Sequence, residues 1–188
     1  PFTISNDSFG YQKLLDHLNR YLITPLVVFE STGVYSLSLQ AFLEENHIKL
    51  GLKNVIQNTG LLGRWQILNK APFTVCDTAH NSHGLKIVLN QIQKHSFKTL
   101  HIVLGVVNDK DLDSILPLFP KNANYYFCKP NVPRGLDAEF LKQKASDFGL
   151  FGKVFNSVSD AYEDARKTAT KSDFIYIGGS TFVVAEIV

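Results

Sequence analysis

The sequence predicts an α/β fold built on a mostly parallel, doubly wound sheet with helices on both faces, preceded by a short extra βα segment. From residue 73 onward, short apolar runs alternate with longer stretches whose apolar residues recur at helical spacing, a pattern typical of βαβ units. Polar residues gather where one of these runs ends, at Asp77, His80 and Asn81. We expect a Rossmann-like arrangement with a binding site beyond the carboxyl ends of its strands.

The strands predicted for this sheet are short and rich in β-branched and aromatic residues. They cover residues 73–76, 100–105, 124–128, 154–155 and 174–177. Helices are expected between them, and Asp111 and Ser157 stand where two of these helices begin. The predicted helices cover residues 85–93, 111–119, 136–148 and 157–170.

An N-terminal segment precedes this domain. Ser8 stands before leucines at helical spacing, which predicts a capped helix that ends before Pro25. An apolar strand over 26–30 and a helix over 37–46 follow. We place the domain boundary after residue 48, so that residues 1–48 form the first domain and 49–188 the second.

Composition narrows the class of protein. With 188 residues, 45% of them hydrophobic, the chain can bury a substantial core. A net charge of +2 gives no strong basic field, so general nucleic-acid binding is not expected. Cys76 and Cys128 lie in strand-like apolar runs. This placement favours buried free thiols in a reducing compartment, and the absence of paired Cys or His spacing argues against a zinc site.

Location follows from what the sequence does not contain. No stretch approaches the ~20 continuous apolar residues of a membrane span, and the N-terminus has no secretory signal pattern, so we expect a cytoplasmic, monomeric protein. The sequence begins with Pro1 and contains no methionine. We interpret it as a piece of a longer reading frame.

Three short motifs follow one another along the chain. A Gly-Arg-x-Gln segment ends at Gln66, an Asp-x-Ala-His-Asn segment spans 77–81, and a Gly-Ser pair ends at Ser180 after an apolar strand. Together, over residues 49–188, they resemble the C-terminal domain of folylpolyglutamate synthase/dihydrofolate synthase, in the Mur ligase family. Three motifs in one order are much more specific than any one of them.

The resemblance implies an ATP-dependent acid–amino-acid ligase. In that chemistry ATP phosphorylates a folate or pteroate carboxylate, and the amino group of L-glutamate attacks the acyl phosphate. ATP, Mg²⁺, L-glutamate and folate or dihydropteroate are then the expected ligands. The phosphate loop and most magnesium ligands lie in the family's N-terminal and central domains, and no Gly-x-x-x-x-Gly-Lys-Ser/Thr segment occurs in this sequence. We therefore expect the chain to be inactive without that ATPase domain.

The resemblance also assigns roles to the first two motifs. Arg64 would reach phosphate or ribose oxygens of ATP, and Asp77 would accept hydrogen bonds from its ribose or base side. His80 and Asn81 are the catalytic candidates, because they would shape the approach of glutamate and phosphate. The residues alone leave plainer readings open: Arg64 as a surface arginine, Asp77 as a helix cap and His80 as an ordinary loop histidine.

Further candidates follow other strands of the sheet. Asp109 and Lys110 match the Asp-Lys-Asp segment of the same family and would share the rim with Asp77, although a surface salt bridge is the alternative. Ser180 lies in a Gly-Gly-Ser turn that could cradle an anion on backbone N–H groups. Arg134 follows another strand, where a role in ligand binding and a role in helix entry are both open.

Residues 1–48 have a second resemblance. The segment from Phe29 to Tyr35, with Glu30 at the end of a predicted strand, is similar to part of the transposases of the IS110 class. Two-metal phosphoryl chemistry needs several carboxylates, and one glutamate cannot hold such a site. Two alternatives to a ligase domain therefore stay open: a non-catalytic α/β interaction module and a transposase-derived DNA-binding fragment.

Overall fold

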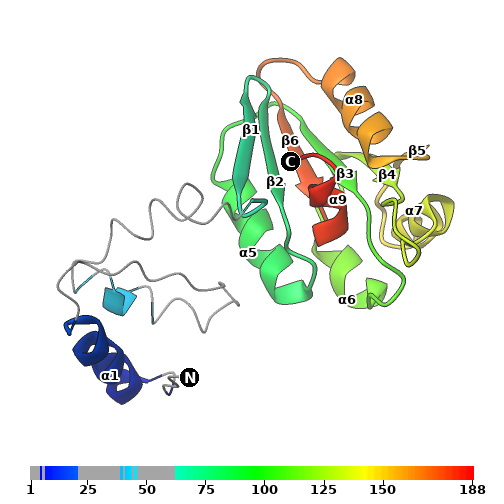
Figure 1. The fold of residues 1–188 in the computed structure, drawn as a ribbon. Coiled ribbons are helices and arrows are strands. Elements are labelled where there is room, and N and C mark those ends of the chain that lie inside the picture. Colours follow the sequence, from blue (N-terminus) through cyan, green and yellow to red (C-terminus); the bar gives the residue numbers. More distant parts are fainter. Residues whose placement is uncertain (1–4, 6, 21–38, 40, 44, 46–61) are drawn as a thin grey trace. The chain divides into compact units, whose positions relative to one another are not determined.

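The computed structural model describes residues 5, 7–20, 39, 41–43, 45 and 62–188. The chain forms two compact units, residues 1–61 and 62–188 (Figure 1). The predicted boundary after residue 48 falls among residues that are not described. The same holds for the predicted strand over 26–30, and so for Glu30.

The first unit contains α1, Ser8–Leu18. Its N-cap is Asp7, whose carboxylate accepts a hydrogen bond from the Gly10 N–H at 2.8 Å. The prediction that Ser8 is the cap was therefore wrong by one residue. An aspartate before the first turn satisfies a free N–H group and also places negative charge at the positive end of the helix. Of the helix predicted over 37–46, residues 39, 41–43 and 45 are helical.

The second unit is built on a six-stranded sheet. Its strands are β1 (Gln66–Lys70), β2 (Phe73–Asp77), β3 (Leu100–Leu104), β4 (Asn124–Cys128), β5 (Gly152–Phe155) and β6 (Phe174–Gly178), in the spatial order β1-β2-β6-β3-β4-β5. The β1 strand is antiparallel to β2, and all other pairs are parallel. The predicted strands are thus confirmed, whereas β1 was not predicted.

Helices cover both faces of this sheet, as the sequence predicts. On one face α5 (Ser82–Gln93), α6 (Leu112–Ile115), the 3₁₀ turn η1 (Leu116–Leu118) and α7 (Ala138–Ser146) enclose the larger core. On the other face α8 (Val158–Thr168) and α9 (Thr181–Ala185) enclose a second core. Alternate strand residues feed the two cores: Ile102 and Leu104 point into the first, and Val103 points into the second.

Capping residues begin several of these helices. Asp111 and Ser157 are the N-caps of α6 and α8, which confirms both predictions. A single helix over 111–119 is wrong, because the α-helix stops at Ile115 and a 3₁₀ turn follows. Pro117 explains the change, since it has no N–H group to continue the α-helical hydrogen bonds.

The place of β6 determines where a ligand could bind. From their carboxyl ends, β2 and β3 lead to α5 and α6 on one face, whereas β6, which lies between them, leads to α9 on the other face (Figure 1). Connections therefore diverge to opposite faces around the carboxyl end of β6. Such a switch point is where open α/β sheets bind ligands.

Within the described part of the chain, every helix is too short or too polar to cross a bilayer.

Candidate functional site

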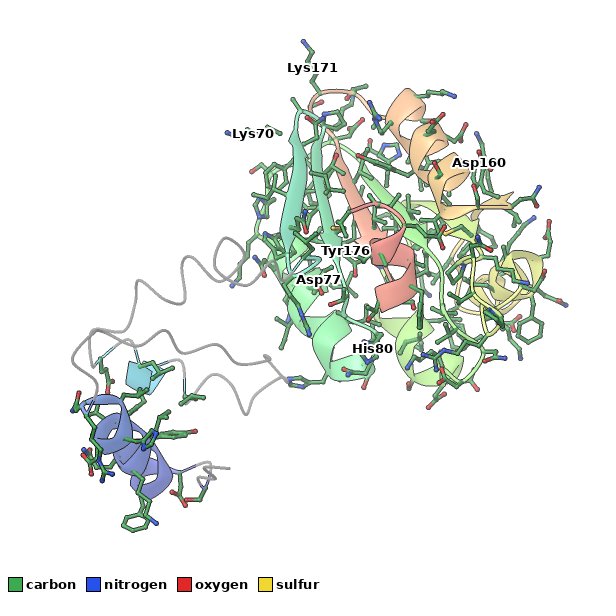
Figure 2. The ribbon with its side chains drawn as sticks, in the orientation of Figure 1. Lys70, Asp77, His80, Asp160, Lys171 and Tyr176 are labelled. Carbon is green, nitrogen blue, oxygen red and sulfur yellow. The ribbon has the colours of Figure 1, made fainter. Side chains whose placement is uncertain are left out.

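Asp77 forms the centre of the candidate site. It is the last residue of β2 and its side chain is almost fully buried, with 8% of the residue exposed. One carboxylate oxygen accepts the Trp65 N–H at 2.6 Å and the other accepts the Ala79 N–H at 2.8 Å. The reading of Asp77 as a helix cap does not hold, because Asn81 is the N-cap of α5. Figure 2 shows Asp77 at the end of β2, close to the carboxyl end of β6.

The loop before β1 is folded onto the turn after β2. The Gly63 carbonyl oxygen accepts the Thr78 N–H at 2.8 Å, and the Gly63 N–H donates to the Gln66 side chain at 2.7 Å. Gly63 has φ +77°, and a Cβ there would lie 2.6 Å from a methyl carbon of Val184. Glycine is therefore required both by the backbone conformation and by the space. The Gly-Arg-x-Gln and Asp-x-Ala-His-Asn motifs thus form one hydrogen-bonded unit.

Burial and charge act in opposite directions on Asp77. Burial raises the pKa of its carboxyl group above the ordinary value. The hydrogen bonds from Ala79 and Trp65 and the positive charge of Arg64 lower this pKa, but they only partly offset the effect of burial. Arg64 is partly exposed and belongs to the same loop. The site therefore brings a buried carboxylate and a guanidinium group together at the rim of the sheet.

His80 and Asn81 occupy the start of α5. The Nδ1 atom of His80 lies 2.9 Å from the Thr78 carbonyl oxygen, which only accepts hydrogen bonds, so this geometry assigns the proton of neutral His80 to Nδ1. Its other nitrogen then has a lone pair, on an exposed side chain. The Asn81 side-chain oxygen accepts the Gly84 N–H at 2.8 Å and caps α5. His80 is thus placed to accept a proton, and Asn81 has a structural task.

The loops after β3 and β4 form a second cluster of charge. Asp109 lies 3.3 Å from Arg134 and 3.8 Å from Lys110. The Arg134 guanidinium also lies over the Phe182 ring, 4.9 Å from its centre. Asp109 and Arg134 are both 52% exposed, so their ion pair contributes little to stability. The structure therefore brings Asp109 and Lys110 together with Arg134, and these charges are available at the surface.

Ser180 lies in the turn between β6 and α9. The residue is only 2% exposed, and its hydroxyl oxygen accepts the Phe182 N–H at 3.2 Å as the N-cap of α9. The preceding Gly179 has φ +94°, and a Cβ there would lie 2.7 Å from the Gly105 carbonyl oxygen. The turn thus approaches the end of β3 closely. The fold uses the Ser180 hydroxyl internally, beside Asp77 and its loop.

Sequence reasoning missed two contributors to this site. Trp65 occupies the variable position of its motif, yet its backbone N–H holds Asp77, and its φ of 44° is unusual for a bulky residue. Tyr176 lies in β6 with a fully buried hydroxyl that has no hydrogen-bond partner in the part of the chain that the structure describes. The sequence did offer one indication of Tyr176: it stands between two isoleucines, just before Gly178 and Gly179.

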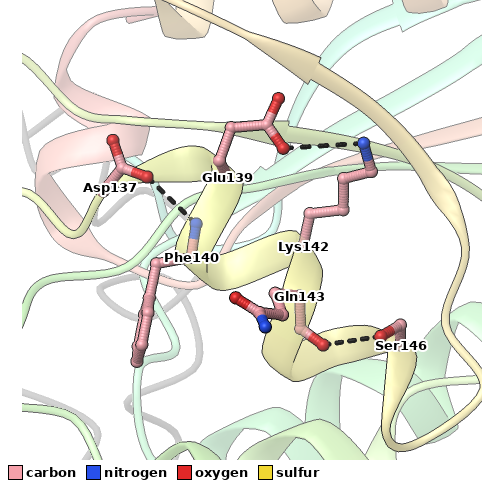
Figure 3. Close-up of a pocket in the computed structure, with 6 residues that line it drawn as sticks. All are labelled: Asp137, Glu139, Phe140, Lys142, Gln143 and Ser146. Carbon is pink, nitrogen blue, oxygen red and sulfur yellow. Dashed lines mark hydrogen bonds and ion pairs between the residues drawn. The ribbon is translucent and has the colours of Figure 1, made fainter.

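A hollow on the outer side of α7 encloses about 520 Å³ but does not resemble a binding site (Figure 3). Its polar side chains are engaged locally: Asp137 caps the helix through the Phe140 N–H at 3.0 Å, and Glu139 lies 3.5 Å from Lys142. It also lies away from the switch point. Among the described residues, no group of three His, Cys, Asp or Glu side chains is placed to hold a metal ion.

Comparisons with known proteins show which proteins this chain resembles. The family model described as Mur ligase, glutamate ligase domain, matches residues 63–181. The dihydrofolate synthases/folylpolyglutamate synthases of Buchnera aphidicola subsp. Schizaphis graminum and of Escherichia coli K12 are each 30% identical to the chain, over 72% and 77% of its length. The chain spans only about a third of these relatives, 32% and 33%.

A solved structure is similar as well. The structure of Escherichia coli FolC in complex with DHPP and ADP has a TM-score of 0.68 and 26% identity, and the match covers 87% of this chain and 39% of that chain. These comparisons do not support the transposase resemblance of residues 1–48. With the model of the glutamate ligase domain matching residues 63–181, the chain belongs to the Mur ligase family.

Proposed function

We propose that this chain is the C-terminal, nucleotide-facing part of an ATP-dependent ligase that adds glutamate to folate or dihydropteroate through an acyl phosphate. The family match, the relatives named as dihydrofolate synthase/folylpolyglutamate synthase and the ADP and DHPP bound by the E. coli protein support this proposal. They concern proteins about three times as long, so the reaction belongs to the whole ligase.

One observation carries the proposal: the buried Asp77 carboxylate is fixed at the switch point of the sheet by the loop that carries Arg64, whose charge acts on it. A buried carboxylate with defined orientation suits the hydroxyl groups of a ribose, and a guanidinium group suits phosphate oxygens. The two backbone N–H groups fix the carboxylate before a ligand arrives, which reduces the ordering that binding requires. The pair therefore provides complementary contacts for a nucleotide.

The remaining candidates would serve glutamate and the transferred phosphoryl group. Lys110 and Arg134 would attract carboxylate or phosphate oxygens, and His80 has a nitrogen free to accept a proton from an incoming amino group. Ser180 and Asn81 would act through the turns that they cap. ATP phosphates and Mg²⁺ would be held mainly by the ATPase domain, because the 188 residues contain no phosphate-loop segment.

A titration of the full chain with ATP and Mg²⁺ tests the proposal. Trp65 is the only tryptophan in the sequence and its N–H donates to Asp77, so its fluorescence should report binding directly. We expect Asp77→Asn to weaken binding by about 10-fold or more, since hydrogen bonds to a charged group contribute about 1.5–3 kcal/mol. Asp137→Asn, which changes an exposed cap outside the site, is the matched control.

Two results would count against the proposal. Absence of nucleotide binding would favour the non-catalytic interaction module. Equal affinity of wild type and Asp77→Asn would place the nucleotide elsewhere. The chain alone should not form glutamyl product from ATP, folate and glutamate, and product formation by the purified chain would refute the assignment of the phosphate site to another domain.

A further inference from the structure

A buried hydroxyl group, that of Tyr176, reaches the end of β6 at the level of Asp77. In the parallel pair β2–β6, Asp77 is opposite Gly178, and Val75 is opposite Tyr176. Val75 and Tyr176 point into the same core, and side chains two residues apart in a strand share a face. Asp77 and Tyr176 therefore project from neighbouring strands to the same side of the sheet, and Figure 2 labels both near the carboxyl ends of β2 and β6.

Gly178 brings the phenol to the level of Asp77. A Cβ at position 178 would collide with the Tyr176 hydroxyl and would lie 2.8 Å from the Asp77 carbonyl oxygen. The phenol thus fills the space of the missing side chain and reaches the carboxyl end of β6. Because Gly178 and Asp77 are paired in register, the hydroxyl ends at the same level of the sheet as Asp77.

Among the described residues, no acceptor takes the hydroxyl hydrogen of Tyr176. Tyr176 is 0% exposed, and its oxygen has no hydrogen-bond partner among the described residues. A hydroxyl hydrogen can rotate, and the carboxylate is the strongest acceptor in this environment. The carboxylate accepts only two N–H groups from the described residues, although its two oxygens offer about four acceptor positions.

We propose that Tyr176 is a positioning residue for Asp77: its O–H dipole points at the carboxylate, favours the ionised form and holds its orientation. The role in ligand binding rests on the proposed function, but the effect on Asp77 does not. Among the described residues, the titratable and charged groups that interact electrostatically with Asp77 are Arg64 from the preceding loop, Tyr176 from β6 and Cys76, which points to the opposite face of the sheet. Burial keeps the pKa of Tyr176 well above its ordinary value, so the phenol retains its proton.

A pH titration without ligand tests this proposal in the full chain. Protonation of Asp77 weakens its contact with the Trp65 N–H, so tryptophan fluorescence should show an acid transition that Asp77→Asn removes. The His95 ring is stacked on Trp65 with centres 5.8 Å apart, so only a transition that Asp77→Asn removes is assigned to Asp77. We expect Tyr176→Phe to move the Asp77 transition to higher pH by about 0.5 unit or more.

Tyr125→Phe is the matched control. Tyr125 is also buried in the larger core, but its hydroxyl donates to the Pro120 carbonyl oxygen at 2.6 Å, so this variant should lose stability without moving the Asp77 transition. Tyr176→Phe should change its unfolding midpoint little, because the lost support of the ionised Asp77 and the removal of a buried hydroxyl act in opposite directions. Thermal unfolding of both variants separates a general loss of packing from the proposed effect.

The outcomes separate the two proposals. An unchanged transition in Tyr176→Phe, an equal shift in Tyr125→Phe, or no transition that depends on Asp77 would overturn the role of Tyr176. If ATP with Mg²⁺ binds, Tyr176→Phe should weaken it about 3-fold or more, most strongly toward acid pH. Failure of wild type to bind ATP counts against the proposed function, and the ligand-free titration then decides on Tyr176.

Discussion

Replacement of Asp173 by alanine should destabilise the second unit strongly. Asp173 is 5% exposed and lies just before β6, where its carboxylate accepts the Thr99 N–H at 3.0 Å, the Thr170 N–H at 2.7 Å and the Thr170 hydroxyl at 2.8 Å. It therefore joins the start of β3 to the turn before β6. Alanine would leave both backbone donors without this acceptor.

The expected loss follows from counting those donors. A buried donor without a partner costs about 1–3 kcal/mol, and these two backbone donors are partly buried, so Asp173→Ala should lose about 2–4 kcal/mol. The Thr170 hydroxyl adds little, because Thr170 is exposed and can turn to water. Since domains are stable by about 5–15 kcal/mol, the variant should approach the limit of folding.

Urea denaturation measures this loss, with Asp137→Ala as the comparison. Asp137 accepts one backbone N–H, from Phe140 at 3.0 Å, at an exposed helix start, so its replacement should cost about 1 kcal/mol. The midpoint should fall much further for Asp173→Ala while the slope stays constant. A loss for Asp173→Ala no larger than that for Asp137→Ala would refute the reasoning from buried donors.

Three further predictions concern other parts of the second unit. Gly63→Ala should lower the free energy of unfolding by about 2–4 kcal/mol, because it combines a left-handed backbone with contact to Val184; a loss below 1 kcal/mol in urea denaturation would show that the loop relaxes. Burial lowers the pKa of His101 below its unfolded value of about 6.5. Between these two pKa values the unfolded state binds more protons than the folded state, so the free energy of unfolding falls as pH decreases. His101→Gln should flatten the pH dependence of unfolding there, and an unchanged dependence would contradict this cause. Burial raises the pKa of Cys76 to about 11 and that of Cys128 further, so a thiol reagent at pH 8 should label neither until denaturant is added; rapid labelling of the native protein would show that the sheet opens locally.

Most of the main sheet could be predicted from local patterns, but its antiparallel edge strand β1 could not. The buried parallel strands are continuous apolar runs, which a sequence shows directly. The β1 strand escaped prediction because it lies at the edge: Ile67 is 51% exposed and only alternate residues are covered. The position of β6 between β2 and β3 was also beyond local patterns, since it depends on pairing between residues far apart in the chain.

The candidate site could likewise be predicted only in part from the sequence. Motif spacing singled out Arg64 and Asp77, which the fold brings together, as well as Asp109 and Lys110, which it places with Arg134. The backbone N–H of Trp65 binds Asp77 to the loop that carries Arg64. Every residue type except proline has such an N–H group, so the sequence could not reveal this hydrogen bond. Tyr176 could be related to Asp77 only once the register of two strands was known.

The central place of β6 has a consequence for how the protein is made. A ribosome releases the chain from its N-terminus, so β1 to β5 emerge before the strand that joins them. Until residues 174–178 are available, the β1–β2 hairpin and the β3–β4–β5 group each present an inner edge that β6 will later pair. Unpaired edges invite contact with other chains, and long-range pairing is slow to form. A chain truncated before residue 174 should therefore remain as two separate half-sheets that are prone to aggregate, whereas completion of β6 closes the sheet in one step.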